Sequence, residues 1–325
     1  RQRQMCIRDR STVAQVNDIV DNYTSGVVTA TIAEGDMTTL ATLTATAGAY
    51  TINITDTTVA AAALNTLDGK TTTAITLATG TTLTGALANT GAVDTALSSA
   101  GITGIGSVAV TSDDVTNTVT EANDISSQTT GVVTATLATG TLASFAGLNE
   151  TGNAVTISVS DTGTVDAATV NVLNGNTTGV VTLAATGVSG ALSDIKTLYE
   201  ANTAAEVAGL GNETVTISDT GSVSAADLNT VNGLSTGVIT AIGVTTVTGT
   251  LAEIKTAYAA GSAGTISGLG NEAITVSDTG AITSTDLSDL DALTTGSVTI
   301  SLSGTSVAAT TLNTLDASST QVVSA

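Results

Sequence analysis

The chain has 325 residues, 42% of them apolar, and it contains no His, Pro or Trp and a single Cys. A formal net charge of -21 disfavours contact with nucleic acid and with anionic membranes and leaves cations as the natural small partners. No apolar run is long enough to span a membrane. Because the usual residues of acid-base, nucleophilic and phosphate chemistry are missing beyond residue 10, we predict that the chain is not an enzyme.

The first ten residues, RQRQMCIRDR, differ from the rest of the chain in charge. They hold four of its seven basic residues and its only cysteine, Cys6. The segment resembles the peptide that results when sequencing-adapter DNA is translated at the edge of a metagenomic read. We therefore treat residues 1–10 as a non-native or disordered tail. Residues 11–325 are expected to form a single repeat domain, truncated at both ends.

Short strands recur along this domain, each followed by a turn, a short helix and a second turn. Intervals of either 23–25 or 33–35 residues separate the first inward-pointing positions of the strands. These positions are Val28, Ile52, Ile75, Val108, Val133, Ile157, Val181, Val215, Ile239, Ile274, Val298 and Val323. The extra ten residues of the long intervals equal about three turns of helix, so we expect an inserted helix there.

The stretch Val215–Gly237 shows the repeat in its plainest form. Alternation at Val215 and Ile217 predicts a strand with one buried face. Ser224 is a candidate helix cap, and Gly233 is expected to end the helix in the left-handed conformation. The returning turn ends in Thr-Gly, as it does in several other repeats. Related helices are predicted at 62–69, 167–175, 286–290 and 311–315, and longer ones at 190–201 and 250–258.

Because one such unit cannot bury its own apolar face, its recurrence indicates stacking. We predict an α/β solenoid of about twelve rungs, with one parallel sheet face backed by short helices. The alternative is a three-faced parallel β-helix in which the Ala/Leu-rich segments are further strands.

Outward-pointing threonines form the first candidate site, a ligand face on the sheet. Regular Thr columns resemble those of ice-binding β-solenoids, but Thr is also the ordinary small polar residue of an exposed sheet. The candidate face comprises Thr29, Thr31, Thr76, Thr134, Thr136, Thr182, Thr216, Thr240, Thr275 and Thr299.

Aspartates in the turn after a strand form the second candidate site, a metal site for Ca²⁺. They are Asp56, Asp113, Asp161, Asp219 and Asp278. Ca²⁺ takes six to eight oxygen ligands, and Asn212-Glu213 or Asn271-Glu272 could add to such a site. The alternative is that each Asp closes its own turn. Apart from Ca²⁺, no cofactor is expected.

Two further sets of residues are expected to be structural. Asn65, Asn229 and Asn313 recur in Leu-Asn-x-Leu-type segments and are predicted to bond backbone groups of the turns. Tyr199 and Tyr258 are predicted to cover a helix face.

The segments GLGNEAITVSDTG and SAADLNTVNGLSTGVITA resemble repeats of very large, acidic, Thr/Ala/Gly-rich secreted proteins of marine bacteria and cyanobacteria. The resemblance covers nearly all of residues 11–325. It implies an extracellular or cell-surface location and a structural or adhesive role as a stalk or spacer. The expected partners are adjoining rungs or domains of a longer chain. The alternative is a solenoid that binds ice, surface glycans or mineral through its Thr face.

Overall fold

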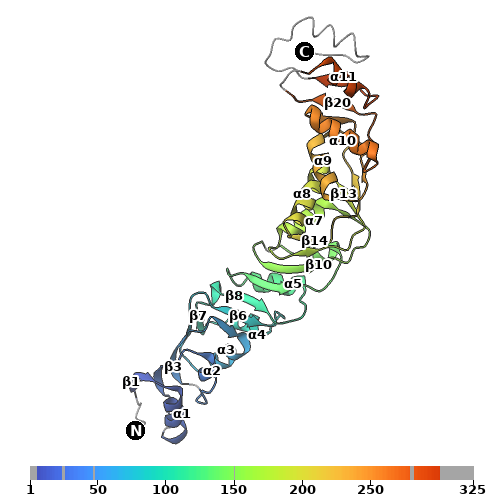
Figure 1. The fold of residues 1–325 in the computed structure, drawn as a ribbon. Helices are drawn as coiled ribbons and strands as arrows, with labels where there is room; N and C mark the ends of the chain where they lie inside the picture. The colour runs from blue at the N-terminus through green and yellow to red at the C-terminus, as the bar shows by residue number, and fades with distance from the viewer. Residues whose placement is uncertain (1–5, 24–25, 47, 150, 279–281, 301–325) are drawn as a thin grey trace. The chain divides into compact units, whose positions relative to one another are not determined.

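The computed structural model describes residues 6–23, 26–46, 48–149, 151–278 and 282–300 (Figure 1). The chain divides into two compact units. Arg1–Thr139, Ala143–Ser158 and Gly175–Gly179 make up the first unit, and Gly140–Leu142, Val159–Asn174 and Val180–Ala325 make up the second. In both, parallel strands alternate with short helices, which confirms the predicted α/β class. The predicted helix at 311–315 and the strand at Val323 lie outside the described residues.

The first unit contains two parallel sheets. One has the order β1-β2-β3-β5-β7, and in the other β4, β6, β8, β9 and β10 follow one another. The strands are β1 (Cys6–Ser11), β2 (Thr29–Ile32), β3 (Ala49–Ile54), β4 (Thr58–Ala60), β5 (Ile75–Leu77), β6 (Thr82–Gly85), β7 (Ile102–Thr103), β8 (Ala109–Ser112), β9 (Val133–Thr136) and β10 (Ala154–Ser158). The helices are α1 (Val13–Asn22), α2 (Met37–Leu40), α3 (Ala61–Asp68), α4 (Ala92–Leu97), the 3-10 turn η1 (Ile105–Ser107) and α5 (Val119–Ser126).

The second unit follows the same plan. Its sheets have the orders β11-β13-β15-β17-β19 and β16-β18-β20-β21, and β12 pairs with β14. The strands are β11 (Thr164–Asp166), β12 (Val181–Thr182), β13 (Gly187–Gly190), β14 (Val207–Ala208), β15 (Thr214–Ile217), β16 (Ser222–Ser224), β17 (Ile239–Thr240), β18 (Thr246–Gly249), β19 (Ile266–Ser267), β20 (Ala273–Val276) and β21 (Val298–Ile300). The helices are α8 (Leu192–Thr203), α9 (Ala225–Leu234), α10 (Leu251–Ala263) and α11 (Ser284–Asp291). Two further helices, α6 (Leu142–Phe145) and α7 (Ala167–Gly175), include residues from both units.

Strand alternation places the apolar residues inside, as the sequence predicts. Parallel registers then stack buried residues on one another, so that Ile52 pairs with Ile75 and Val215 pairs with Ile239. Removing such aliphatic side chains from water contributes about 1.5–3 kcal/mol for each fully buried residue.

The helices are also set by local sequence. Helix α9 begins at Ser224, whose hydroxyl accepts the Asp227 N–H at 3.3 Å, and it buries Leu228 and Val231. Gly233 lies inside the helix, so the prediction that it ends the helix in a left-handed conformation is wrong. The Ala/Leu-rich segments that the structure describes form α3, α7, α9 and α11. The alternative in which they are strands is therefore wrong for these segments.

The predicted single sheet face is also wrong. Several sheets are present, and the three long intervals arise where the column of inward positions passes from one sheet to the next. Ile75 pairs with Ile102 rather than aligning with Val108, and Ile239 pairs with Ile266 rather than aligning with Ile274. Helices do occupy the two later long intervals, α8 and α10, but so do two-residue strands, β14 and β19. Directly paired positions are 26 residues apart at β14 and 27 residues apart at β7 and β19.

A glycine follows each of three two-residue strands that lie at a sheet edge. The strands β7, β14 and β19 each have two residues and are followed by Gly104, Gly209 and Gly268, whose φ angles of 84°, 93° and 90° lie in the left-handed region. A residue with a Cβ rarely adopts this conformation, so glycine lets the backbone turn away from the sheet. The edge strand is consequently kept very short, which limits unwanted pairing with another chain.

Candidate functional site

The threonines of the candidate ligand face lie on several sheets instead of forming one column. Thr76 on β5 pairs with Asn53 and Thr103, and the exposed hydroxyls of Thr76 and Thr103 are 3.1 Å apart. The other members lie on β2 (Thr29, Thr31), β9 (Thr134, Thr136), β12 (Thr182), β15 (Thr216), β17 (Thr240), β20 (Thr275) and β21 (Thr299). Within one sheet Thr216 pairs with Thr240, and within another Thr275 pairs with Thr299.

Each row of hydroxyls is therefore short. Thr103, which the sequence reading missed, belongs to the row of Thr76, and Thr111 belongs to that of Thr134. Both follow from the strand register, which a single sequence does not fix where strands are only two to four residues long.

Four of the five candidate metal-binding aspartates make a shared contact with a helix. Their Oδ2 atoms accept hydrogen bonds of 2.5–2.7 Å from the backbone N–H of the first residue of a helix 19 or 27 residues earlier. The pairs are Asp56 with Met37 of α2, Asp161 with Leu142 of α6, Asp219 with Leu192 of α8, and Asp278 with Leu251 of α10. We call these four the capping aspartates.

This contact answers a general need of helices. The first N–H groups of a helix have no partner within it, and a negative charge there interacts favourably with the helix dipole. The fifth candidate, Asp113, is exposed and makes no such contact, whereas its neighbour Asp114 accepts the N–H of Leu87 at 3.1 Å, in the loop before α4 rather than at a helix start. The capping aspartates thus join each repeat to the preceding one. In the part of the chain that the structure describes, no group of three or more His, Cys, Asp or Glu is placed to hold a metal ion.

The returning turns make a second regular link. We call Thr129–Gly131, Thr177–Gly179, Ser235–Gly237 and Thr294–Gly296 the return turns. In each, the first hydroxyl accepts the glycine N–H at 2.9–3.0 Å. The middle N–H donates at 2.7–3.0 Å to a carbonyl of the preceding repeat, namely that of Gly106, Asn153, Gly211 and Gly270, respectively.

The return turns require glycine for reasons of space. A Cβ at Gly131 would collide with the backbone of Val108, and a Cβ at Gly237 would collide with the carbonyl oxygen of Glu213. The Thr-Gly pattern in the sequence therefore marks the closest approach of two successive repeats.

Two tyrosines form buried pairs with glutamates. The Tyr199 hydroxyl donates to Glu213 Oε2 at 3.1 Å, and Tyr258 donates to Glu272 Oε2 at 3.0 Å. Each glutamate also accepts the N–H of the glycine two residues before it, at 2.7 and 2.8 Å. Burial raises the pKa of Tyr199 to about 12, with a further contribution from the Glu213 carboxylate, and burial also raises the pKa of Tyr258.

These pairs change the interpretation of both residue types. The tyrosines lie in the core rather than merely covering a helix face, and Glu213 and Glu272 are only 2% and 1% exposed. The glutamates therefore hold the turn before a strand instead of adding to a surface ion site. The signal in the sequence is the repeated GLGNE, in which each Glu follows its Tyr by 14 residues.

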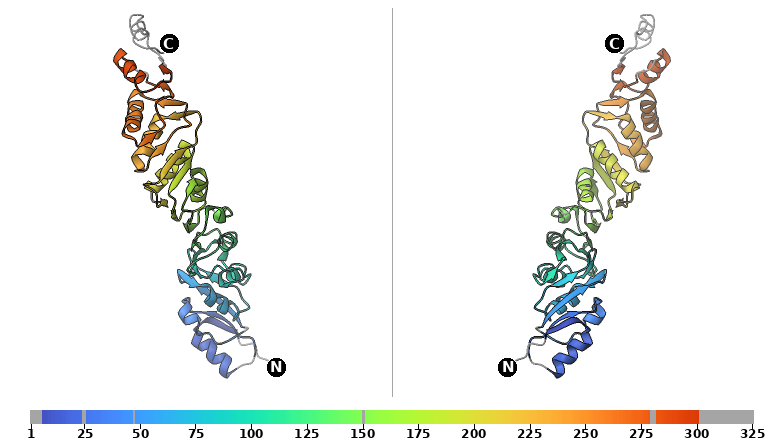
Figure 2. Two further views of the ribbon diagram at one scale, coloured as in Figure 1. Left: turned by 90° about the vertical axis from the view of Figure 1, so that its right-hand side faces the viewer. Right: turned by 90° about the vertical axis from the view of Figure 1, so that its left-hand side faces the viewer.

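Asparagines and lysines connect neighbouring helices, which stand side by side in each unit (Figure 2). Asn65 Nδ2 donates to the Ala92 carbonyl and Asn229 Nδ2 to the Glu253 carbonyl, both in the first turn of the next helix. Both asparagines bond to backbone, as predicted, but the acceptors lie in a helix rather than in the turns between strand and helix. Asn313 lies outside the described residues. Lys196 contacts Glu200 on its own helix and also Asp227 on α9.

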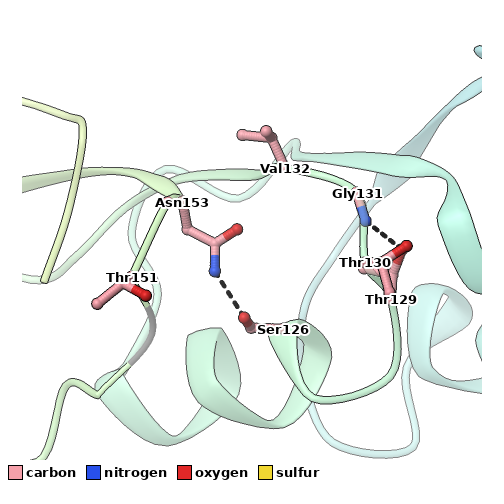
Figure 3. Close-up of a pocket in the computed structure, with 8 residues that line it drawn as sticks. Ser126, Thr129, Thr130, Gly131, Val132, Thr151 and Asn153 are labelled. Carbon is pink, nitrogen blue, oxygen red and sulfur yellow. Dashed lines mark hydrogen bonds between the residues drawn. The ribbon is translucent and has the colours of Figure 1, made fainter.

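One polar pocket lies in the first unit, between a return turn and the loop before β10 (Figure 3). It has a volume of about 250 Å³ and is lined by Ser126, Thr129, Thr130, Gly131, Val132, Thr151, Gly152 and Asn153. Asn153 bridges the pocket walls, since its Oδ1 accepts the Val133 N–H at 2.7 Å and its Nδ2 donates to Ser126 Oγ at 2.6 Å. This pocket could not be predicted from the residue types, because hydroxyl residues are common throughout the chain.

Comparison with known proteins gives no match to a family model, to a curated protein or to a solved structure. Among the described residues, no helix combines the length and apolar character that crossing a membrane requires.

Proposed function

We propose that the chain is a structural or adhesive repeat segment of an extracellular protein, in which it serves as a stalk or spacer. In this proposal residues 11–325 form an α/β solenoid, and successive turns of the chain stack through parallel strands. Its partners are adjoining repeats or domains of a longer protein, and it carries no catalytic centre.

The observation that carries the proposal is the use made of polar side chains. Capping aspartates, return-turn hydroxyls, helix asparagines and lysines each bond a group in a neighbouring repeat. Repeats in a solenoid are stabilised mainly by their neighbours, so such links raise the stability of the array. A spacer needs this property more than it needs a ligand site.

Pulling single molecules with optical tweezers tests the proposal. A stalk should unfold in steps of one or a few repeats and refold when the force is released. A repeat of 20 to 27 residues, the distance between directly paired strand positions, should release roughly 65–95 Å of chain at about 3.3–3.6 Å per residue. Irreversible unfolding of the whole chain in one event would contradict the proposed role as a stalk.

The exposed hydroxyl pair of Thr76 and Thr103 favours a second candidate, a ligand-binding face for ice, glycan or mineral. Thermal hysteresis or inhibition of ice recrystallisation that disappears in a T76Y/T103Y variant would support ice binding. Their absence from the unmodified chain would exclude ice as the ligand.

A further inference from the structure

The pocket beside Asn153 arises where a return turn is replaced. The turns before and after it read Thr-Thr-Gly, at 129–131 and 177–179, whereas residues 151–153 read Thr-Gly-Asn. At some strand starts the backbone bonds directly to the next repeat, as the Val110 N–H does to the Val132 carbonyl at 2.9 Å, and at others to a short side chain, as the Val155 N–H does to Thr177 Oγ1 at 2.9 Å. At Val133 the corresponding N–H bonds instead to the side-chain oxygen of Asn153.

A side chain inserted in this way holds the two loops apart. The distance between them is set by the length of the asparagine side chain rather than by one backbone hydrogen bond. The amide is fixed at both ends, by Val133 and by Ser126, so it can keep the space open without a ligand. Figure 3 shows the Asn153 amide pointing toward Ser126 at the end of α5, with the return turn Thr129–Gly131 across from it.

The lining of the pocket limits what can bind there. Asn153 and Ser126 form a buried floor, whereas Thr130, Val132 and Thr151 are exposed at the rim. The lining residues that the structure describes are all uncharged: they offer hydroxyls, an amide and peptide groups, together with one apolar surface at Val132. A charged ligand would therefore leave its charge unpaired, which is costly in a partly buried site.

Size gives a second limit. A volume of about 250 Å³ corresponds to roughly eight water molecules at about 30 Å³ each. Drug-sized apolar ligands usually occupy pockets of about 300–1,000 Å³ with mainly apolar walls. A small molecule with many hydroxyls and an apolar edge matches both the size and the lining.

We propose that this pocket binds a single neutral pyranose residue, as a free sugar or as the end of a glycan. The hydroxyls of Thr130 and Thr151 lie at the rim to exchange hydrogen bonds with sugar hydroxyls, and Val132 offers a surface to the C–H groups of the ring. The site is separate from the Thr rows of the sheets and is independent of the stalk role. A sugar could therefore bind even if the stalk proposal fails, and the reverse also holds.

Saturation-transfer NMR on the whole chain tests this site. The probes are methyl α-glucopyranoside, methyl β-galactopyranoside and N-acetylglucosamine, with glucuronate and glucosamine as charged counterparts. We expect at least one neutral probe to bind with a dissociation constant in the range of about 1–10 mM, and the charged counterparts to bind at least about tenfold more weakly.

Two variants and a control locate the binding. T151L fills the mouth of the pocket without adding an aromatic surface that could stack on a sugar, and it should abolish the signal. T130A removes a rim hydroxyl and should weaken binding several-fold. The matched control is T236A, because Thr130 and Thr236 donate equivalent hydroxyl bonds, to Gly106 and Gly211, and Thr236 does not line the pocket. Absence of signal with every neutral probe, or an undiminished signal in T151L, would refute the proposal.

Discussion

Replacing the capping aspartate Asp219 by alanine is expected to loosen the start of helix α8. Its Oδ2 accepts the Leu192 N–H at 2.7 Å, and Leu192 is the first residue of that helix. The N-cap of α8, Ala191, makes no side-chain cap bond of its own. The helix therefore depends on a carboxylate supplied from 27 residues further along the chain.

The size of the effect follows from two contributions. A hydrogen bond to a charged group is worth about 1.5–3 kcal/mol, and loss of a helix cap costs about 0.5–2 kcal/mol. Because Asp219 is partly exposed, we expect D219A to cost about 1–2 kcal/mol. D219N keeps an acceptor and loses only the charge, so it should cost about 0.3–1 kcal/mol.

Native-state hydrogen exchange is the appropriate assay, since long repeat proteins often do not unfold in a two-state manner. D219A should lower the protection of the Leu192 amide by about 5–30-fold, which corresponds to the expected loss of free energy. The matched control is D113A, since Asp113 is exposed and sits in an equivalent turn in which Asp114 accepts the N–H of Leu87. If D219A leaves Leu192 protection unchanged, the capping argument is refuted.

Three further predictions concern a return turn, a buried tyrosine and Ca²⁺. G237A should destabilise the second unit by about 1–3 kcal/mol, because the added Cβ would overpack against the backbone of Glu213. G221A has open space around its Cβ and should be neutral or slightly stabilising. Urea denaturation compares the two variants, and equal effects would contradict the close approach at Gly237. Between pH 10 and 12 the unfolded state ionises Tyr199 while the folded state does not, so the contribution of Tyr199 to stability should be complete below pH 10 and fall by about 2 kcal/mol by pH 12. Tyr258 adds a loss of the same sign, so Y199F should lose about 2 kcal/mol less than the unmodified chain, and identical pH profiles for the two chains would show that Tyr199 is not buried as described. Adding Ca²⁺ or EDTA should leave the melting temperature unchanged, because the Asp219 carboxylate already binds a backbone N–H. A rise in melting temperature with Ca²⁺ that is lost in D219A would instead support a metal site at Asp219.

Local features of the fold could be predicted because they depend on neighbours in the sequence. Alternation at Val215 and Ile217 gave the strand, and Ser224 gave the start of α9. The repeated Thr-Gly turns were also visible. The reason for the glycine could not be predicted, because a Cβ at Gly237 would collide with the carbonyl oxygen of Glu213 in the preceding repeat.

Features that depend on register could not be predicted. A strand of two residues, such as β7 or β19, shows no alternation, so its presence was invisible and its residues were assigned to long connections. Without these strands, the predicted fold placed the strands of separate sheets on one sheet and aligned Ile75 with Val108. The same limit applied to Asp219, because the helix that it caps begins 27 residues earlier.

The staggered ends of the sheets have a mechanical consequence. In the first unit one sheet ends at β7, while beside it β8 continues to pair with β9. In the second unit a sheet ends at β19, while β20 continues to pair with β21. Unfolding that starts at the edge strand of either sheet must therefore also break the strand pairing that continues in the other sheet before the unit can separate.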